Sequence, residues 1–154
     1  MSGSPAEAGR GEGLPTWLEA TLGPGDHREV VAIGWATVDF ERAAGELGGR
    51  WQAAPADSLL GGRAWIRQAP ADAAEGPYRI ILLEPSTEGR LAAALARRGE
   101  GPVAVYRRPA TGPADGRTKA GDGPLGPQQL ELDGPVAGPF RLSLVEADRV
   151  PSEP

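Results

Sequence analysis

The sequence predicts an α+β protein built on a strand-helix-strand-strand-strand order, abbreviated βαβββ below. An apolar, β-branched segment at 29–37 runs directly into Phe40, Ala43 and Leu47, which recur at helical spacing. Several short apolar segments bounded by glycine, proline and serine follow, as expected for the strands of one sheet. A chain of 154 residues can bury one core of ordinary size, so a single domain is expected.

Each expected helix has its own start and stop signals. Asp39 is expected to cap the helix that begins at Phe40, and Gly48-Gly49 to end it in a left-handed conformation. Ser86-Thr87 is expected to open a second helix, which Gly99 closes. Beside the segment at 29–37, strands are expected at 50–53, 63–68, 78–83, 102–108, 128–132 and 140–145.

The ends of the chain and one internal segment have other patterns. Residues 1–13 and 151–154 are expected to be tails. Residues 14–22 have leucines at a spacing of four, which predicts a short helix docked on the body of the protein. Glycine and proline dominate 109–127, where apolar side chains are almost absent, so a long, flexible loop is expected there.

The composition excludes several classes of function. The net charge of −5 at pH 7 argues against nucleic acid as a partner, because phosphate binding needs clustered cations. No apolar run approaches the roughly 20 residues of a spanning helix, so no membrane is expected. The absence of cysteine removes disulfides, thiolate ligands and cysteine nucleophiles. Together with an N-terminus that lacks a signal-peptide pattern, it favours a cytoplasmic protein.

Two stretches resemble the vicinal oxygen chelate superfamily, which includes glyoxalase I, bleomycin-resistance proteins and methylmalonyl-CoA epimerase. The first, AIGWATVDFERA at 32–43, resembles the opening strand and the aspartate that starts the following helix. The second, ILLEP at 81–85, continues through RGEG at 98–101 into VAVY at 103–106. It resembles the segment of the epimerases that ends one module and starts the next. The resemblance implies βαβββ modules whose mixed sheet forms an open or partly closed cup, with helices packed outside.

The resemblance also divides the chain. It implies one glyoxalase-like domain at 14–150, with a first module at 29–85, a linking helix at 86–101 and a second module at 102–147. The second module is expected to be degenerate, because the glycine- and proline-rich segment stands where the family has a helix.

Members of the superfamily hold a divalent metal through histidine or glutamate side chains on the sheet. The resemblance places these four positions at Ala32, Ile81, Ala104 and Ser143. None of these side chains is the charged or strongly dipolar ligand that such cations need. We therefore expect neither a metal nor another cofactor.

Strand alternation predicts which residues line the cup. If Ala32 faces the cup, Gly34 and Ala36 face it as well, and its floor is roomy. Applied to the other strands, the same phase places inside the cup Arg79, Ile81, Ala104, Tyr106, Arg141 and Ser143. It sends to the helix-packed side Ile33, Trp35, Ile80, Leu82, Val103, Val105, Leu142 and Leu144.

The lining of the cup gives a candidate site for a small organic anion or an aromatic ligand. Arginines can pair with a carboxylate or phosphate through two hydrogen bonds, and aromatic rings can stack on a flat group. The candidate ligand-binding residues are Arg79, Arg108, Arg141, Tyr106, Trp65 and Ser143. The alternative is an open sheet face, on which these arginines lie in water or pair with nearby acids.

The sequence offers few candidates for acid or base chemistry. Glu84 ends a strand just before Pro85, where a carboxylate could act as a base or simply face water. Tyr106 is the other candidate. His27 is the only histidine, and no triad or ligand set accompanies it in the sequence, so a structural role is expected.

Three functions remain open. The first is a metal-free protein that binds a small organic anion or aromatic ligand in an accessory role. The second is a metal-independent isomerase or lyase of the same superfamily, with Glu84 or Tyr106 as its acid or base. The third is an interaction module whose open sheet is completed by a second copy, because unpaired strand edges tend to be covered. A homodimer is expected.

Overall fold

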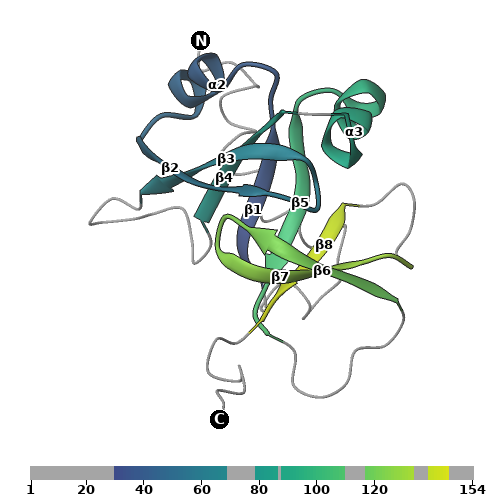
Figure 1. Ribbon diagram of the computed structural model, residues 1–154. Helices are drawn as coiled ribbons and strands as arrows, with labels where there is room; N and C mark the ends of the chain where they lie inside the picture. The colour runs from purple at the N-terminus through teal and green to yellow at the C-terminus, as the bar shows by residue number, and fades with distance from the viewer. Residues whose placement is uncertain (1–29, 69–78, 87, 110–116, 134–138, 146–154) are drawn as a thin grey trace.

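A computed structural model of the chain describes residues 30–68, 79–86, 88–109, 117–133 and 139–145. The expected tails, the expected helix at 14–22 and His27 lie outside these residues. Within them, the chain forms two helices and eight strands, as expected for an α+β protein (Figure 1). No helix of this part of the chain is long and apolar enough to cross a membrane.

The strands form one mixed sheet that curls into a half-barrel (Figure 1). Their order across the described sheet is β2-β3-β4-β1-β5-β8-β7-β6. Strand β1 runs parallel to β4 and antiparallel to β5, so the β1/β5 pair joins the two halves of the sheet at its centre. The bounds are β1 Val30–Ala36, β2 Arg50–Asp57, β3 Gly62–Gln68, β4 Arg79–Pro85, β5 Gly101–Arg107, β6 Thr118–Gly123, β7 Gly126–Glu131 and β8 Phe140–Leu144.

The first half confirms the predicted βαβββ order, with helix α2 (Phe40–Leu47) between β1 and β2. Asp39 caps this helix, since its Oδ1 accepts a hydrogen bond from the N–H of Arg42 at 3.3 Å. Gly48 ends it with φ of 77°, a conformation that side-chain-bearing residues rarely adopt. Helix α3 (Arg90–Arg98) links the two halves and ends at Gly99, as predicted.

The expected loop at 109–127 is wrong in its second part. Residues 118–123 form β6, which pairs with β7 along its whole length, and 110–116 lie outside the described residues. The strand has no apolar stripe because it is an edge strand of small and polar residues held by backbone hydrogen bonds. A Cβ at Gly121 would lie 2.7 Å from Cγ of Leu59, so only glycine allows this close approach.

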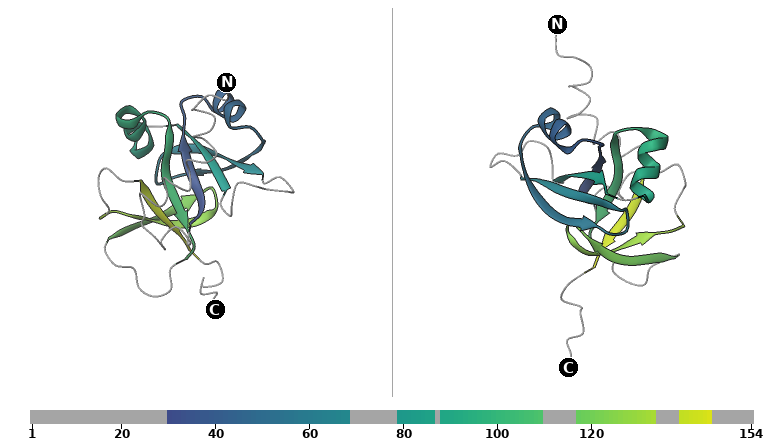
Figure 2. Two further views of the ribbon diagram at one scale, coloured as in Figure 1. Left: turned by 180° about the vertical axis from the view of Figure 1, so that it is seen from behind. Right: turned by 45° about the horizontal axis from the view of Figure 1, so that its top comes forward.

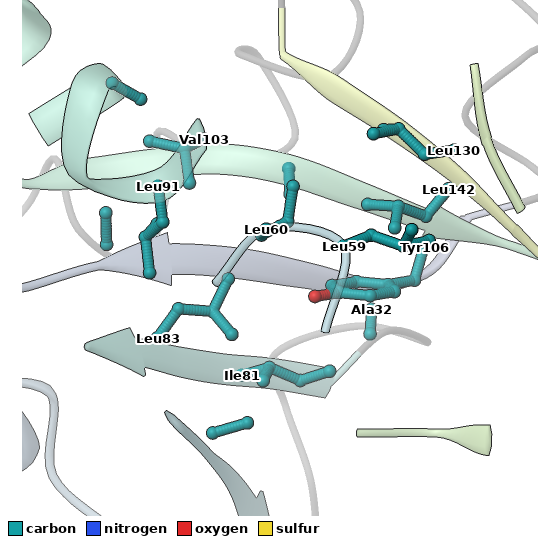
Figure 3. Close-up of a cluster of buried hydrophobic side chains, with 14 residues drawn as sticks. Ala32, Leu59, Leu60, Ile81, Leu83, Leu91, Val103, Tyr106, Leu130 and Leu142 are labelled. Carbon is teal, nitrogen blue, oxygen red and sulfur yellow. The ribbon is translucent and has the colours of Figure 1, made fainter. Parts of the chain in front are cut away.

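The half-barrel has two faces that bury separate clusters. The inner face carries the larger one, to which β1 contributes Ala32 and Ala36 and helix α3 contributes Leu91 and Ala94 (Figure 3). The outer face carries a smaller cluster that includes Ile33, Ile80 and Val105, against which Leu47 of α2 packs. The alternation predicted for β4, and for β1 from Ala32 onward, is therefore confirmed. Val31, which the same alternation places on the outer face, packs against the inner cluster instead, because the β1/β5 register shifts between Val30 and Ala32.

Gly62, at the start of β3, should tolerate no side chain. A Cβ there would lie 2.9 Å from the carbonyl oxygen of Glu84 and 2.4 Å from Cδ2 of Leu91. We expect Gly62→Ala to lower the free energy of unfolding by about 1–3 kcal/mol, as overpacking does. Gly45→Ala in helix α2, where a Cβ meets nothing within 4 Å, should raise it by roughly 0.5–1 kcal/mol. Urea unfolding of both variants checks this, and equal effects would contradict it.

Candidate functional site

The centre of the inner face holds a buried polar cluster of Asp57, Tyr106 and Gln128. The hydroxyl of Tyr106 donates to Oδ2 of Asp57 at 2.7 Å. Oδ1 of Asp57 accepts from Nε2 of Gln128 at 3.0 Å and from the backbone N–H groups of Leu59 and Leu60 at 3.1 and 2.9 Å. All three polar side chains are fully buried. The carboxylate is thus saturated by four donors from three parts of the chain.

Tyr106 is poorly suited to act as an acid or base. Burial and the neighbouring Asp57 carboxylate together raise the pKa of the Tyr106 phenol well above its ordinary value. The hydroxyl therefore stays protonated at neutral pH, and its proton is already donated to Asp57. This arrangement makes Tyr106 a structural hydrogen-bond donor.

The prediction of a roomy cup floor is wrong, because the turn between β2 and β3 fills it. Leu59 and Leu60 from this turn lie buried in the inner cluster beside Tyr106 (Figure 3). The same turn reaches the far edge of the sheet, where the N–H of Ser58 donates to the carbonyl of Asp122 at 2.9 Å. Figure 2 shows the β6-β7 hairpin beside this turn. Alternation gave the direction of the inner side chains, but the residues that cover them come from elsewhere in the chain.

Three of the four positions at which the family resemblance implied metal ligands lie together beneath the turn between β2 and β3. Gly34 of β1 pairs with Ile81 on one side and Ala104 on the other, and Ala32 precedes it on the same face. Ala32, Ile81 and Ala104 are fully buried in the inner cluster. Within the described residues, no group of three or more histidine, cysteine, aspartate or glutamate side chains could hold a metal ion.

Arg141 and Ser143 do not face the cup, contrary to the prediction. Leu142 pairs with Tyr106 and lies in the inner cluster, so its two neighbours on β8 point to the outer face. Leu142 was expected on that outer side. The prediction was wrong because the inward direction of Ser143 was assigned from the family resemblance, and not from the pairing of β8 with β5. Val103 also lies in the inner cluster, since the β1/β5 register shifts between Gly34 and Trp35.

Trp65 likewise lies on the outer face, away from Tyr106. It pairs with Leu82, whereas its neighbour Ile66 pairs with Ile81 of the inner face. The Trp65 ring stacks on Phe40 at the start of α2, with ring centroids 4.0 Å apart. Trp65 therefore helps to fix α2 on the sheet.

Glu84 and Glu100 hold the start of helix α2. Oε2 of Glu84 accepts from the N–H of Phe40 at 3.0 Å, and its other oxygen pairs with Arg63. Oε2 of Glu100 accepts from the N–H of Val38 at 2.9 Å and from Nη2 of Arg42 at 2.5 Å. Both carboxylates satisfy donors near the helix N-terminus, where negative charge is stabilising. Glu84 is neither in the inner face nor free to accept a proton from a substrate.

An open groove of about 610 Å³ lies at the margin of the inner face. The β2, β3 and β4 strands form one wall, and Pro124 in the turn between β6 and β7 forms the other. Strand pairing places Gln52 opposite Ile66, and Arg79 opposite Ala32, on the inner face. The lining residues are Gln52, Ala53, Ala54, Pro55, Ile66, Arg67, Gln68, Arg79 and Pro124.

Arg79 is the one predicted ligand-binding residue that lines this groove. It is exposed and has no hydrogen-bond or ion-pair partner in the described part of the chain. Arg108, also exposed, follows the end of β5 and does not line the groove. Sequence reasoning missed Gln52 and Gln68, because it assigned no inward face to β2 and placed Trp65 of β3 on the inner face, which is the opposite phase to that of Gln68. It also missed Asp57 and Gln128.

Several solved structures that resemble this chain are methylmalonyl-CoA epimerases. The Streptomyces coelicolor epimerase in complex with 2-nitronate-propionyl-CoA has a TM-score of 0.57 and 18% identity, covering 77% of this chain and 98% of the epimerase. The Mycobacterium tuberculosis epimerase has a TM-score of 0.56 and 15% identity, covering 77% and 89% of the two chains. A hypothetical protein from Bacillus halodurans has a TM-score of 0.57 and 16% identity, covering 80% and 98%.

These likenesses confirm the predicted fold: the chain has the vicinal oxygen chelate fold, as an eight-stranded mixed sheet with α-helices. No protein-family model matches the sequence, and no curated protein sequence matches it either. Identities of 15–18% leave the function to be argued from the residues of the groove.

Removing the Tyr106 hydroxyl should destabilise the protein without changing its fold. Tyr106→Phe keeps the ring but leaves Oδ2 of Asp57 buried without its donor. We expect the free energy of unfolding to fall by about 1–3 kcal/mol, the cost of an unsatisfied buried group. Urea unfolding measures this. In the Asp57→Asn background the same substitution should cost less, and equal costs in both backgrounds would contradict a direct coupling.

The ion pair at the start of α2 should weaken in acid. Hydrogen bonding to Arg42 holds the pKa of Glu100 below its ordinary value of 4.5. A depressed folded-state pKa contributes stability that is complete above the unfolded-state pKa and is lost as the pH falls through the folded-state pKa. We therefore expect thermal stability to decline below about pH 4.5, and less steeply in Glu100→Gln. The exposed Glu88→Gln serves as a control, and an unchanged acid limb in Glu100→Gln would contradict the assignment.

Proposed function

We propose that this protein binds a small organic anion or aromatic acid, without a metal, in the groove beside Arg79. One observation carries the proposal: an exposed guanidinium with no partner among the described residues lines an open groove on the inner side of the sheet. A free guanidinium can hold a carboxylate through two parallel hydrogen bonds. The proposed binding role is accessory, since no catalytic group accompanies Arg79 among the described residues of the lining.

The size and lining of the groove support a small-molecule ligand. Its volume of about 610 Å³ falls within the roughly 300–1,000 Å³ typical of such sites. Ile66, Ala54 and Pro124 offer apolar surface for the body of a ligand, while Arg79 offers the charge. This combination favours an amphipathic acid over an inorganic ion.

The metal-free character rests on the residues at the centre of the inner face. Ala32, Ile81 and Ala104 have no side-chain atom that could bind a divalent cation. The nearby Asp57 carboxylate already accepts four hydrogen bonds. Divalent cations need several charged or strongly dipolar ligands around one point, and these residues do not fit one.

An isomerase of the epimerase type is the second candidate, supported by structural neighbours solved with CoA esters. Such chemistry needs an acid or base beside the substrate. Glu84 lies on another part of the molecule and binds Phe40 and Arg63, and Tyr106 is buried away from the groove. Among the described residues, the groove lining contains no carboxylate, histidine or phenol. We therefore favour binding over catalysis.

We also propose a cytoplasmic homodimer. The sheet has two edge strands, β2 and β6, which are bridged within the described chain through Ser58 and Asp122 at one end of the gap. Beyond this bridge, none of the described strands lies beside the outer edge of β2 around Ala53 and Ala54. Such edges tend to be covered by another chain. The absence of cysteine supports the cytoplasmic location.

Removing the groove cation should weaken anion binding. We expect benzoate, a small aromatic acid, to bind the wild-type protein in isothermal titration calorimetry. Arg79→Ala should weaken this binding at least about tenfold, because hydrogen bonds to charged groups contribute about 1.5–3 kcal/mol. Native mass spectrometry of the purified protein should show whether a natural acid is retained.

Two controls make this measurement specific. Arg97→Ala removes an exposed arginine from helix α3, so it changes the net charge equally and should leave benzoate binding unchanged. Prior dialysis against a chelator should also leave binding unchanged. Equal binding by Arg79→Ala and wild type would overturn the assignment of the groove, and loss of binding after chelation would overturn its metal-free character.

A dimer should be visible in sedimentation velocity at micromolar concentration. We expect a species with twice the mass of the 15.9 kDa chain. A charged residue on the exposed β2 edge, as in Ala53→Lys, should shift the equilibrium toward the monomer, because edge lysines oppose strand pairing. A 15.9 kDa species without concentration dependence would show that the monomer closes its own sheet.

A further inference from the structure

Two glutamines beside Arg79 form a hydrogen-bonded pair on the inner face. Nε2 of Gln68 donates to Oε1 of Gln52 at 3.2 Å, across the β2-β3 pair. Both side chains are exposed and both line the groove. A carboxamide offers two N–H donors and one carbonyl oxygen. In either orientation of the two amides, a single bond leaves one carbonyl oxygen and at least two N–H groups free, side by side.

This pair is complementary to an amide group. A ligand amide has one N–H donor and one carbonyl acceptor, and the remaining carbonyl oxygen and N–H groups of Gln52 and Gln68 can pair with either of them. A ligand whose only polar group is a carboxylate bound to Arg79 would leave these groups of Gln52 and Gln68 hydrogen-bonded to water. The pair therefore adds a recognition element that the charge of Arg79 does not supply.

The groove offers one guanidinium to an anion. Arg67 also contributes to the lining, but its guanidinium lies 5.9 Å from the centre of the Trp51 ring and its Nη1 donates to the carbonyl of Leu47 at 3.2 Å. It is thus directed to the outer face. A single guanidinium suits one carboxylate, whereas the several phosphates of a CoA ester would need further cations.

The groove also disfavours a free amino acid. The described residues of its lining include no aspartate or glutamate, so among them an α-ammonium group would find no partner and would lie near the Arg79 cation. Acylation of the amine removes this charge and creates the amide that the glutamine pair can bind.

We infer that the ligand of the groove is an N-acyl amino acid or a similar amide-containing monocarboxylate. Its carboxylate pairs with Arg79, its amide bonds to Gln52 and Gln68, and its apolar body lies against Ile66 and Pro124. This inference rests on the proposed anion-binding function and names the class of ligand.

A pair of probes with equal length and equal charge tests the inference. N-benzoylglycine and 4-phenylbutyrate both join a phenyl ring to a carboxylate through three atoms, but only the first contains an amide. We expect calorimetry to show N-benzoylglycine binding about tenfold tighter to the wild-type protein, as one or two added hydrogen bonds would give. Propionyl-CoA should bind more weakly than N-benzoylglycine.

Substitutions separate the two parts of the site. Gln52→Leu and Gln68→Leu should remove the preference for N-benzoylglycine while 4-phenylbutyrate still binds. Arg79→Gln should weaken both probes by the same factor. Arg97→Gln, which changes an exposed residue of α3, should alter neither, and circular dichroism checks that each variant is folded.

The outcomes distinguish the inference from the proposed function. Equal affinities for the two probes, or a preference that survives in Gln52→Leu and Gln68→Leu, would overturn the amide-containing class and leave anion binding intact. Tighter binding of propionyl-CoA would also overturn it. If neither probe, benzoate nor propionyl-CoA binds the wild-type protein, the proposed function itself fails.

Discussion

The half-barrel depends on one buried carboxylate, that of Asp57. Its four hydrogen bonds tie the turn between β2 and β3 to Tyr106 on β5 and Gln128 on β7. A charge in the interior is costly unless donors surround it, so the network specifies one arrangement of these three segments. The carbonyl of Leu60 in the same turn then receives the N–H of Leu91 at the start of α3.

Because of this arrangement, the open groove lies at the margin of the sheet and not at its centre. The turn that Asp57 organises places Leu59 and Leu60 over the positions where the family resemblance implied a metal. What stays open is the margin between the β2-β3-β4 wall and Pro124, with Arg79 and the two glutamines. The fold shared with epimerases therefore does not fix the function of this chain, which is argued from the residues of the site.

Glu84, the carboxylate that the sequence suggested as a catalyst, has a structural task that it shares with Glu100. Glu84 and Glu100 come from strand and loop ends on either side of α3, yet both bind the backbone before and within the first turn of α2. With Phe40 stacked on Trp65, they fix that helix on the outer face. Glu84, which an acid-base mechanism would have needed, therefore serves to place helix α2.

The sequence by itself determined the βαβββ order, the Asp39 cap, the glycine stops and the inward phase of β1 and β4, because these follow from local periodicity and backbone preference. It also predicted that Arg79 faces the inner side of the sheet, where this residue lines the groove. It missed β6, whose pairing with β7 leaves no apolar pattern, and it misplaced Arg141, Ser143 and Trp65, whose faces depend on register. Only the tertiary structure decided what covers the cup and which polar groups meet, since those contacts join residues as far apart as Asp57 and Gln128.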